Sequence, residues 1–459
     1  MAQPAAPQQT SKRIIVVGGG ISGLASAWFL QHRGHIVTLL ESKGSLGGNL
    51  ATLEEAGFLI ERGPNSTLDN RPALGELIDH LGLADERLAP SSAAKRRFVV
   101  RDGKLVALPG SPQGFLSTPL FSWKAKLRLG LEPFIGKAAH EETIAAFVRR
   151  RLGKEFLDYA INPFVSGVYA GDPEKLSVQA ATARVYELEK SHGSLLKGAW
   201  SLMKARKSKT LETGPSGTLT SFRGGLGQLA RALVQQLENH PHCHVRTHAN
   251  VAAVEQTRSG WSVAFNDERI NADAVVLATP AHVTARLLES QAPEASSALE
   301  NIEYPEVLSI SMAFDRQQVA HALDGFGMLI PRCEGVKTLG TLFPSSIFTG
   351  RAPAGKVLLT SFIGGRLNPQ VAELSDQQLS RQVLADIAPL LGIVGQPEHT
   401  WVTRWPQAIP QYEVGHLERL AEIETALAEL PGLYLRSNWR DGISVADCIQ
   451  QAALLAERL

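Results

Sequence analysis

The chain is poor in cysteine, lacks a long apolar run and carries almost no net charge. Only three of its 459 residues are cysteines, Cys243, Cys333 and Cys448, and their wide spacing suits neither a disulfide framework nor a metal site. No apolar run of about 18 residues occurs, so the sequence predicts no bilayer-spanning helix. With 46 basic and 45 acidic residues the formal charge is +1, which gives no electrostatic case for nucleic acid as a partner.

The N-terminal stretch, MAQPAAPQQTSKR, also lacks the apolar segment of a signal peptide. We expect residues 1–11 to be a short disordered leader and the protein to be cytoplasmic. Apolar residues make up 44% of the chain, which is enough for the full core of two or three domains.

The most informative segment is RIIVVGGGISGLASAWFLQHRGHIVTLLE, which ends at Glu41. Its first apolar run predicts a buried parallel strand, and Gly18, Gly20 and Gly23 then form GxGxxG at the start of a helix. These glycines allow a tight turn, close approach of a pyrophosphate and close packing of helix on strand. Glu41 follows a second apolar strand, where a carboxylate accepts hydrogen bonds from ribose hydroxyls. The predicted dinucleotide site also includes the neighbouring residues Gly19, Ile21, Ser22 and Ser42.

A second glycine-rich turn, SKGSLGGN over 42–49, follows the ribose carboxylate, and ERGPNS follows over 61–66. A nicotinamide dehydrogenase would usually continue into further βαβ units instead. The arrangement resembles the FAD-binding fold of the amine oxidase and phytoene desaturase superfamily. The resemblance places these turn residues beside the pyrophosphate and the flavin: Gly47, Gly48, Asn49, Gly63, Pro64, Asn65 and Ser66.

The predicted fold class is α/β, α+β overall, with a Rossmann-like FAD-binding domain of the amine oxidase type. Buried strands and amphipathic helices assign three separate segments to this domain, 12–88, 211–288 and 401–459. Apolar strands alternating with Gly/Pro loops predict a mixed-sheet substrate domain over 89–111 and 289–400. Residues 112–210 are expected to form a helical, membrane-associating domain.

Six further motifs together resemble the oxygen-dependent, FAD-containing protoporphyrinogen oxidases, and the likeness runs from Arg13 to the final helix. They are AAKRRF (93–98), GVYAGD (167–172), SFRGG (221–225), GFGMLIP (325–331), IPQYEVGH (409–416) and DCI (447–449). The resemblance implies removal of six hydrogens from a porphyrinogen in two-electron steps, with FAD as cofactor and O2 as acceptor, forming H2O2. Coproporphyrinogen, with four propionates rather than two, is a rival substrate. An FAD amine oxidase, a carotenoid desaturase and a non-catalytic lipid-binding flavoprotein also stay open as functions.

The same resemblance assigns contacts to the substrate. Arg97 matches a propionate-binding position, and arginine suits a carboxylate because its planar fork binds both oxygens. The run Lys95-Arg96-Arg97 leaves that register open by one residue. The residues that match the walls of an apolar substrate slot are Phe326, Leu329 and Phe362, with Gly171 and Gly327 as places where backbone can lie flat against the macrocycle.

The flavin supplies the redox chemistry, so no side chain is expected to act as a catalytic base. Asn65 is the one candidate for a catalytic role, through positioning. Further FAD contacts implied by the resemblance are Val251 at the adenine, Trp405 and Ile409 over the isoalloxazine, and Asn438, Gly442, Ile443, Ser444 and Val445 in the C-terminal turn. Two positions depart from the family pattern, because Ser444 replaces a glycine and Ser45 replaces a residue that is often basic.

Basic and apolar residues are mixed in the helical segment. Trp123, Leu127 and Leu131 alternate with Lys124, Lys126 and Arg128, while Arg149-Arg150-Arg151 and KARKSK (204–209) add positive charge. With the resemblance, this pattern predicts a basic amphipathic surface for anionic lipid and peripheral attachment to the inner cell membrane. A solvated helical face is the competing interpretation. A homodimer and hand-over of the product to ferrochelatase are open partnerships.

Overall fold

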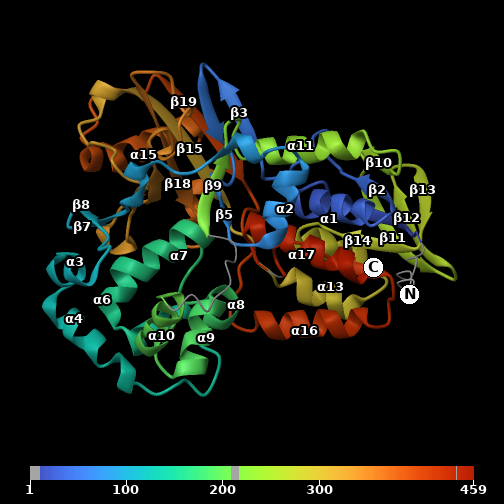
Figure 1. The fold of residues 1–459 in the computed structure, drawn as a ribbon, viewed down its shortest axis with the longest axis horizontal. Coiled ribbons are helices and arrows are strands. Elements are labelled where there is room, and N and C mark those ends of the chain that lie inside the picture. The colour runs from blue at the N-terminus through green and yellow to red at the C-terminus, as the bar shows by residue number, and fades with distance from the viewer. Residues whose placement is uncertain (1–10, 208–216, 441) are drawn as a thin grey trace, which may run out of the picture.

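The computed structural model describes residues 11–207, 217–440 and 442–459. Figure 1 shows one half built around a parallel sheet, a second half around a larger mixed sheet, and a group of helices beside the larger sheet. Residues 1–10 of the predicted leader, and Ser208 and Lys209 of the predicted basic run, lie outside the described residues. Among the described residues, no helix is both long enough and apolar enough to cross a membrane.

The parallel sheet brings together segments that are far apart in the sequence. In spatial order its strands are β10 (Cys243–Arg246), β2 (Ile36–Leu40), β1 (Arg13–Val17), β14 (Ala274–Leu277) and β20 (Leu433–Leu435). Alternate residues of β1 enter different cores, Ile14 on one face and Ile15 on the other. Both faces of the sheet are therefore covered, which explains why its strands read as continuous apolar runs.

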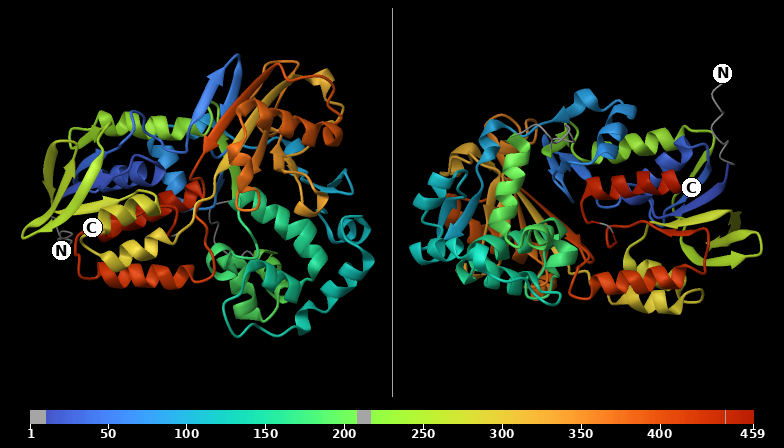
Figure 2. Two further views of the ribbon diagram at one scale, coloured as in Figure 1. Left: turned by 180° about the vertical axis from the view of Figure 1, so that it is seen from behind. Right: turned by 60° about the horizontal axis from the view of Figure 1, so that its bottom comes forward.

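Two groups of elements cover this sheet. The first face carries α1 (Ile21–His32), α2 (Pro72–His80), α11 (Gly227–Glu238) and α17 (Val445–Arg458). The second face carries α12 (Ala281–Leu288), α13 (Pro293–Glu300), α16 (His416–Leu427) and the antiparallel sheet β11 (Val251–Thr257), β12 (Gly260–Phe265) and β13 (Glu268–Ala272). Figure 2 shows α13 and α16 side by side on that face.

The larger sheet has seven strands and is mainly antiparallel. In order they are β19 (His399–Trp405), β15 (Val307–Asp315), β18 (Lys356–Gly364), β17 (Thr338–Leu342), β16 (Gly327–Leu329), β7 (Phe98–Arg101) and β8 (Lys104–Ala107). Helix α15 (Asp376–Leu391) packs on one face. The predicted FAD-binding segment 401–459 thus begins inside a strand of this sheet, because β19 pairs with β15 along its length. The rest of the domain division stays a prediction.

Short strands join the two halves. They are the hairpin β3 (Thr52–Glu55) and β4 (Phe58–Glu61), and the three-stranded group β5 (Thr67–Asp69), β9 (Thr218–Phe222) and β6 (Arg87–Leu88). The helical group contains α3 (Pro112–Ser117), α4 (Trp123–Gly130), α5 (Ile144–Arg151), α6 (Lys154–Phe156), α7 (Asn162–Tyr169), α8 (Val178–Ala181), α9 (Ala183–His192) and α10 (Leu195–Lys207).

The prediction that Arg149, Arg150 and Arg151 add charge to a lipid-binding surface is wrong for Arg151, and it stays a prediction for Arg149, which is exposed, and Arg150, which is half-buried. Arg151 has no exposed side-chain area and is paired with Glu132 and Glu189, which are also buried. Arg150 pairs with Glu142 and Glu189, and Arg149 pairs with Glu174. Acidic residues distant in the sequence neutralise these arginines, so the local charge run does not reveal their role.

Candidate active site

The candidate nucleotide site lies at the carboxyl edge of the parallel sheet. The register aligns one terminal residue of each of four strands, Leu40, Val17, Leu277 and Leu435. Parallel strands end at a common edge, so the loops that follow these residues meet there.

The first glycine turn fits a phosphate group. Gly18 and Gly23 are tightly packed. A Cβ added to Gly18 would lie 2.8 Å from the Ala278 backbone oxygen, and a Cβ added to Gly23 would lie 1.8 Å from the Gly18 backbone oxygen. Gly20 differs, because a Cβ there would meet no other heavy atom within 4 Å. Gly20 is also the N-cap of α1 and offers no side-chain cap. The N–H groups of the first turn, which contains the predicted residues Ile21 and Ser22, therefore face space that a pyrophosphate can fill.

Glu41 is fixed at the end of β2 by its neighbours. Its Oε2 accepts a hydrogen bond of 2.7 Å from the Gly19 N–H. Its Oε1 accepts from the Lys43 N–H at 2.8 Å and from the Ser42 hydroxyl at 3.2 Å. Two carboxylate oxygens have about four acceptor sites, so this anchored group keeps capacity for a ribose hydroxyl.

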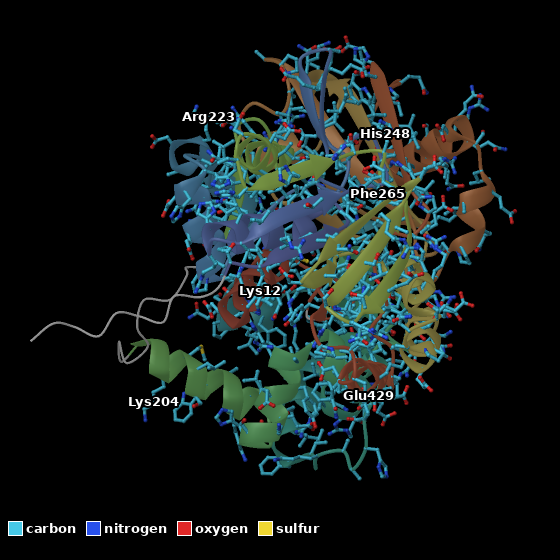
Figure 3. All side chains as sticks on the ribbon, turned by 90° about the vertical axis from the view of Figure 1, so that its right-hand side faces the viewer. Lys12, Lys204, Arg223, His248, Phe265 and Glu429 are labelled. Carbon is cyan, nitrogen blue, oxygen red and sulfur yellow. The ribbon has the colours of Figure 1, made fainter. Side chains whose placement is uncertain are left out.

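The predicted adenine contact, Val251, begins the neighbouring strand β11 and pairs with Phe265. Ala249, two residues earlier, donates its N–H to the Glu41 backbone oxygen at 2.8 Å. Figure 3 labels Phe265, the partner of Val251 on β12, and His248, which precedes Ala249. The structure therefore brings Val251 close to the end of β2.

Two further glycine turns stack on the first. Gly20 and Gly47 form an isolated parallel bridge, and a Cβ added to Gly48 would lie 3.0 Å from the Gly20 Cα. A Cβ added to Gly63 would lie 2.0 Å from the Asn49 oxygen. Backbone thus touches backbone at successive points, so the three predicted cofactor turns form one continuous surface.

The third turn leads toward the larger sheet. The indole N–H of Trp405 donates to the Arg62 oxygen at 2.8 Å. Pro64, Asn65 and Ser66 are half-buried, and Asn65 Nδ2 donates to the Gly63 oxygen at 3.4 Å. An amide held by its own turn can orient a ligand but does not titrate, which fits a positioning role.

A buried ion pair supports this turn from below. Glu61 lies 3.9 Å from Arg351, and Arg351 donates to the Ser221 hydroxyl at 2.8 Å. Burial raises the pKa of Glu61, while hydrogen bonds from the Thr52 hydroxyl and the Leu226 N–H oppose that shift. The pair ties β9 and the residues that follow it to the third turn.

The C-terminal turn precedes α17. Ser444 is the helix N-cap, since its Oγ accepts from the Asp447 N–H at 3.1 Å and its hydroxyl donates to Asp447 Oδ2 at 2.6 Å. Arg71 Nε donates to the other Asp447 oxygen at 2.7 Å. Gly442 has φ +129°, and a Cβ there would lie 2.8 Å from the Asp447 Cβ. The serine that departs from the family pattern therefore has a structural role as a cap. The other predicted residues of this turn are half-buried or buried: Asn438, Ile443 and Val445.

One row of residues crosses the larger sheet beside the third turn. The register pairs them in the order Leu329, Gly340, Phe362, Ser309 and Thr403. Paired residues point to the same face, so Leu329 and Phe362 share a surface. None of the five side chains is ionisable, and the row suits a flat apolar ligand.

Phe362 connects the two groups of predicted residues. It packs in one apolar cluster with Trp405, Ile409 and Ala170. Ala170 precedes the predicted residue Gly171 and adopts a left-handed conformation, φ +49°, at the end of α7. Predicted flavin and substrate contacts therefore meet at the edge of the larger sheet.

The substrate residues on the far side form another cluster. The guanidinium of Arg97 lies over the Phe326 ring at 5.3 Å, whereas Arg96 forms an ion pair with Asp324. In the part of the chain that the structure describes, Arg97 takes part in no ion pair. The geometry favours Arg97 over Arg96 as the group that is available to an anion.

Two residues that the sequence patterns do not single out belong to the site. Leu342 pairs with Gly327, which only the strand register reveals, and it packs against the same cluster of Ile347 and Phe348 as Phe326 does. Gln411 is buried and donates to the Tyr169 oxygen at 2.9 Å, and a Cβ on Gly171 would lie 2.5 Å from its Oε1. The place of Gln411 in the IPQYEVGH motif is the signal that could have found it.

The parallel sheet with its contacting glycine turns, beside a larger mixed sheet, is typical of flavin-binding oxidoreductases. Residues 21–459 match the sequence profile of the flavin containing amine oxidoreductases, and the chain belongs to this family. It is an FAD-dependent enzyme.

Individual relatives extend this likeness over nearly the whole chain. The chain is 34% identical to the chloroplastic protoporphyrinogen oxidase of Nicotiana tabacum over 97% of its own length and 85% of that protein. It is 30% identical to the coproporphyrinogen III oxidase of Bacillus subtilis (strain 168), over 96% of each. A crystal structure from Exiguobacterium sp. 255-15, provisionally described as a protoporphyrinogen oxidase, superposes with a TM-score of 0.83 at 27% identity, covering 98% of this chain and 99% of that one.

Proposed function

We propose that this enzyme oxidises protoporphyrinogen IX to protoporphyrin IX with O2 as acceptor, the penultimate step of haem synthesis. The observation that carries the proposal is the row through Leu329 and Phe362. It holds no ionisable group, meets Trp405 at one end, and lies in the same sheet as the strand that follows Arg97. A large reduced tetrapyrrole needs such an apolar surface, with charge confined to its propionate edge. The chloroplastic relatives that bear the protoporphyrinogen oxidase name support this choice.

The chain's own residues would bind and orient. When bound, FAD would accept two electrons in each of three steps and pass them to O2, so that six hydrogens leave the substrate and three H2O2 form. Gly20 and the α1 N-terminus would hold the pyrophosphate, and Glu41 the ribose. Arg97 would bind a propionate, Phe362 would hold the macrocycle against the Trp405 and Ile409 side, and Asn65 would orient it.

Coproporphyrinogen III is the second candidate, because a relative of that name is 30% identical over nearly the full chain. The test is an oxidase assay of the purified FAD-loaded protein with both porphyrinogens, followed by porphyrin fluorescence and H2O2 release. A higher kcat/KM for protoporphyrinogen would support the proposal. A higher value for coproporphyrinogen would select the second candidate. No turnover of either would overturn porphyrinogen oxidation and favour an amine oxidase or desaturase role.

We also propose that the helical group attaches the enzyme to anionic lipid at the cell membrane. Large apolar side chains are exposed on α3, on α4, on the turn after α4 and on α10, and the most exposed, Phe134, is 85% exposed. The members of this lipid face are Leu116, Trp123, Leu127, Leu131, Phe134, Trp200 and Met203. Lys124 and Lys204 lie within 6 Å of the rings of Trp123 and Trp200, respectively. Figure 3 shows Lys204 on α10 at the periphery of the molecule. Aromatic and basic residues together are typical of a membrane interface.

Vesicle co-sedimentation tests this surface. Binding should be stronger to anionic than to neutral vesicles and should fall at high salt. Phe134→Asp should reduce it, whereas Val394→Asp, at another highly exposed apolar residue, should not. Equal binding of both variants would favour the solvated helical face. The homodimer and hand-over to ferrochelatase stay predictions.

A further inference from the structure

Tyr412 occupies a position between the two halves that the site chemistry has not used. It lies in the loop between β19 and α16 and is 5% exposed. Its hydroxyl donates to the Asn438 oxygen and accepts from the Gly442 N–H at 3.1 Å. One phenol oxygen therefore joins both ends of the C-terminal turn, where the predicted flavin contacts begin.

The ring of Tyr412 is held as firmly as its hydroxyl. It stacks on His416, with centroids 4.3 Å apart and planes 12° apart, and His416 is fully buried. The backbone oxygen of Tyr412 accepts from the Ser177 N–H at 2.8 Å, and the next residue, Glu413, forms a β-bridge with Leu176. The phenol cannot move without disturbing this packing.

The turn that Tyr412 holds leads directly into α17. Gly442 has φ +129°, and a Cβ added there would lie 2.8 Å from the Asp447 Cβ. Any other residue at this position would therefore strain the turn. Ser444 caps the helix two residues later. The orientation of the first free N–H groups of α17 therefore depends on the backbone that the Tyr412 hydroxyl fixes.

We infer that Tyr412 is a positioning residue that sets the flavin's reduction potential through this turn. The inference rests on the proposed FAD site and adds one placement to it, in which the N-terminus of α17 lies at the pyrimidine edge of the flavin. Reduction adds negative charge to that edge, and a helix N-terminus stabilises negative charge. Fixed N–H groups would therefore favour the reduced flavin. Tyr412 would act through this turn, and not by touching the flavin or the substrate.

The test compares Tyr412→Phe with wild type as FAD-loaded protein. Phenylalanine keeps the ring on His416 and removes only the hydroxyl. We expect the midpoint potential to become more negative by about 30 mV, which is a tenfold loss of preference for the reduced flavin in a two-electron couple. Hydrogen exchange in the 438–448 peptide should become about tenfold faster, while exchange in α1 stays unchanged.

Tyr304→Phe is the matched control, because the Tyr304 hydroxyl also accepts a buried backbone N–H, that of Ala281 at 3.1 Å, at the start of α12. It should leave the potential unchanged. If both variants lose stability alike and neither shifts the potential, Tyr412 is only a packing residue and the inference is overturned. If Tyr412→Phe does not accumulate with FAD, Gly442→Ala strains the same turn, and an unchanged potential there overturns the inference.

None of these measurements needs a porphyrinogen. A failed oxidase assay would therefore leave the Tyr412 result standing, and an unchanged potential would leave the proposed substrate standing.

Discussion

The indole N–H of Trp405 donates a 2.8 Å hydrogen bond to the backbone oxygen of Arg62. Trp405 ends the edge strand of the larger sheet, and Arg62 precedes the glycine turn at the predicted flavin site. The same indole packs against the apolar cluster of Ala170, Val307 and Ala408, as Phe362 does. The bond therefore fixes the substrate face relative to the cofactor turns, and a redox site needs this control because misplacement by about 1 Å can cost a hundredfold in rate.

Glu41→Ala should weaken FAD binding by about 1–3 kcal/mol, because ribose hydroxyls and the Gly19 N–H lose a charged acceptor. Isothermal titration of the apoprotein with FAD measures this loss. Glu54→Ala, at an exposed hairpin carboxylate, should leave the affinity unchanged. Equal affinity of the two variants would place the ribose elsewhere.

The nucleotide half could be predicted from the sequence because its signals are local. The two apolar strands expected before and after the GxGxxG helix are β1 and β2, and that helix is α1. Gly18, Gly20 and Gly23 specify a phosphate-binding turn through their spacing alone, whatever the rest of the fold is. The three glycine turns can therefore be identified without knowledge of their contacts.

The strand pairing of the larger sheet could not be predicted from the sequence in the same way. The partners of Phe362 in the substrate row, Gly340 and Ser309, lie 22 and 53 residues away in the sequence, and only the register joins them. The role of the Arg151 charge likewise depends on Glu132 and Glu189, which contact it only in the folded chain. Long-range pairing, rather than local preference, decides such features.

Arg97→Ala should raise the KM for protoporphyrinogen about five- to a hundredfold, since a charged hydrogen bond to a propionate contributes about 1–3 kcal/mol. The flavin spectrum should stay as in wild type. Arg96→Ala should leave KM nearly unchanged, because Arg96 already pairs with Asp324. A KM effect in Arg96→Ala alone would shift the anchor by one residue, and no effect in either would remove the propionate assignment.

Arg151→Met should lower the free energy of unfolding by about 3–5 kcal/mol, because it leaves the buried carboxylate of Glu132 without a cation and leaves Glu189 with Arg150 alone. Urea denaturation of the holoprotein measures the change. Arg149→Met should cost at most about 1 kcal/mol, since its pair with Glu174 is half exposed. Similar costs for the two variants would show that the Arg151 network adds little to the stability of the helical group.

His416 predicts a specific loss of stability on acidification. Burial, assisted by repulsion from Arg419, lowers the pKa of His416 from 6.5 to about 4. Below pH 6.5 the unfolded chain therefore binds a proton at His416 that the folded chain does not bind. The free energy of unfolding falls as the pH falls from 6.5 to about 4, and the contribution of His416 is complete above pH 6.5. His416→Phe keeps a flat ring against Tyr412 and removes this titration. Between about pH 6.5 and pH 5 the wild type should lose about 2 kcal/mol more stability than the variant, as measured by urea denaturation across that range.

His140→Phe, at an exposed histidine, should follow the wild-type curve. Parallel curves for wild type and His416→Phe would mean that the folded protein protonates this ring as readily as the unfolded chain does.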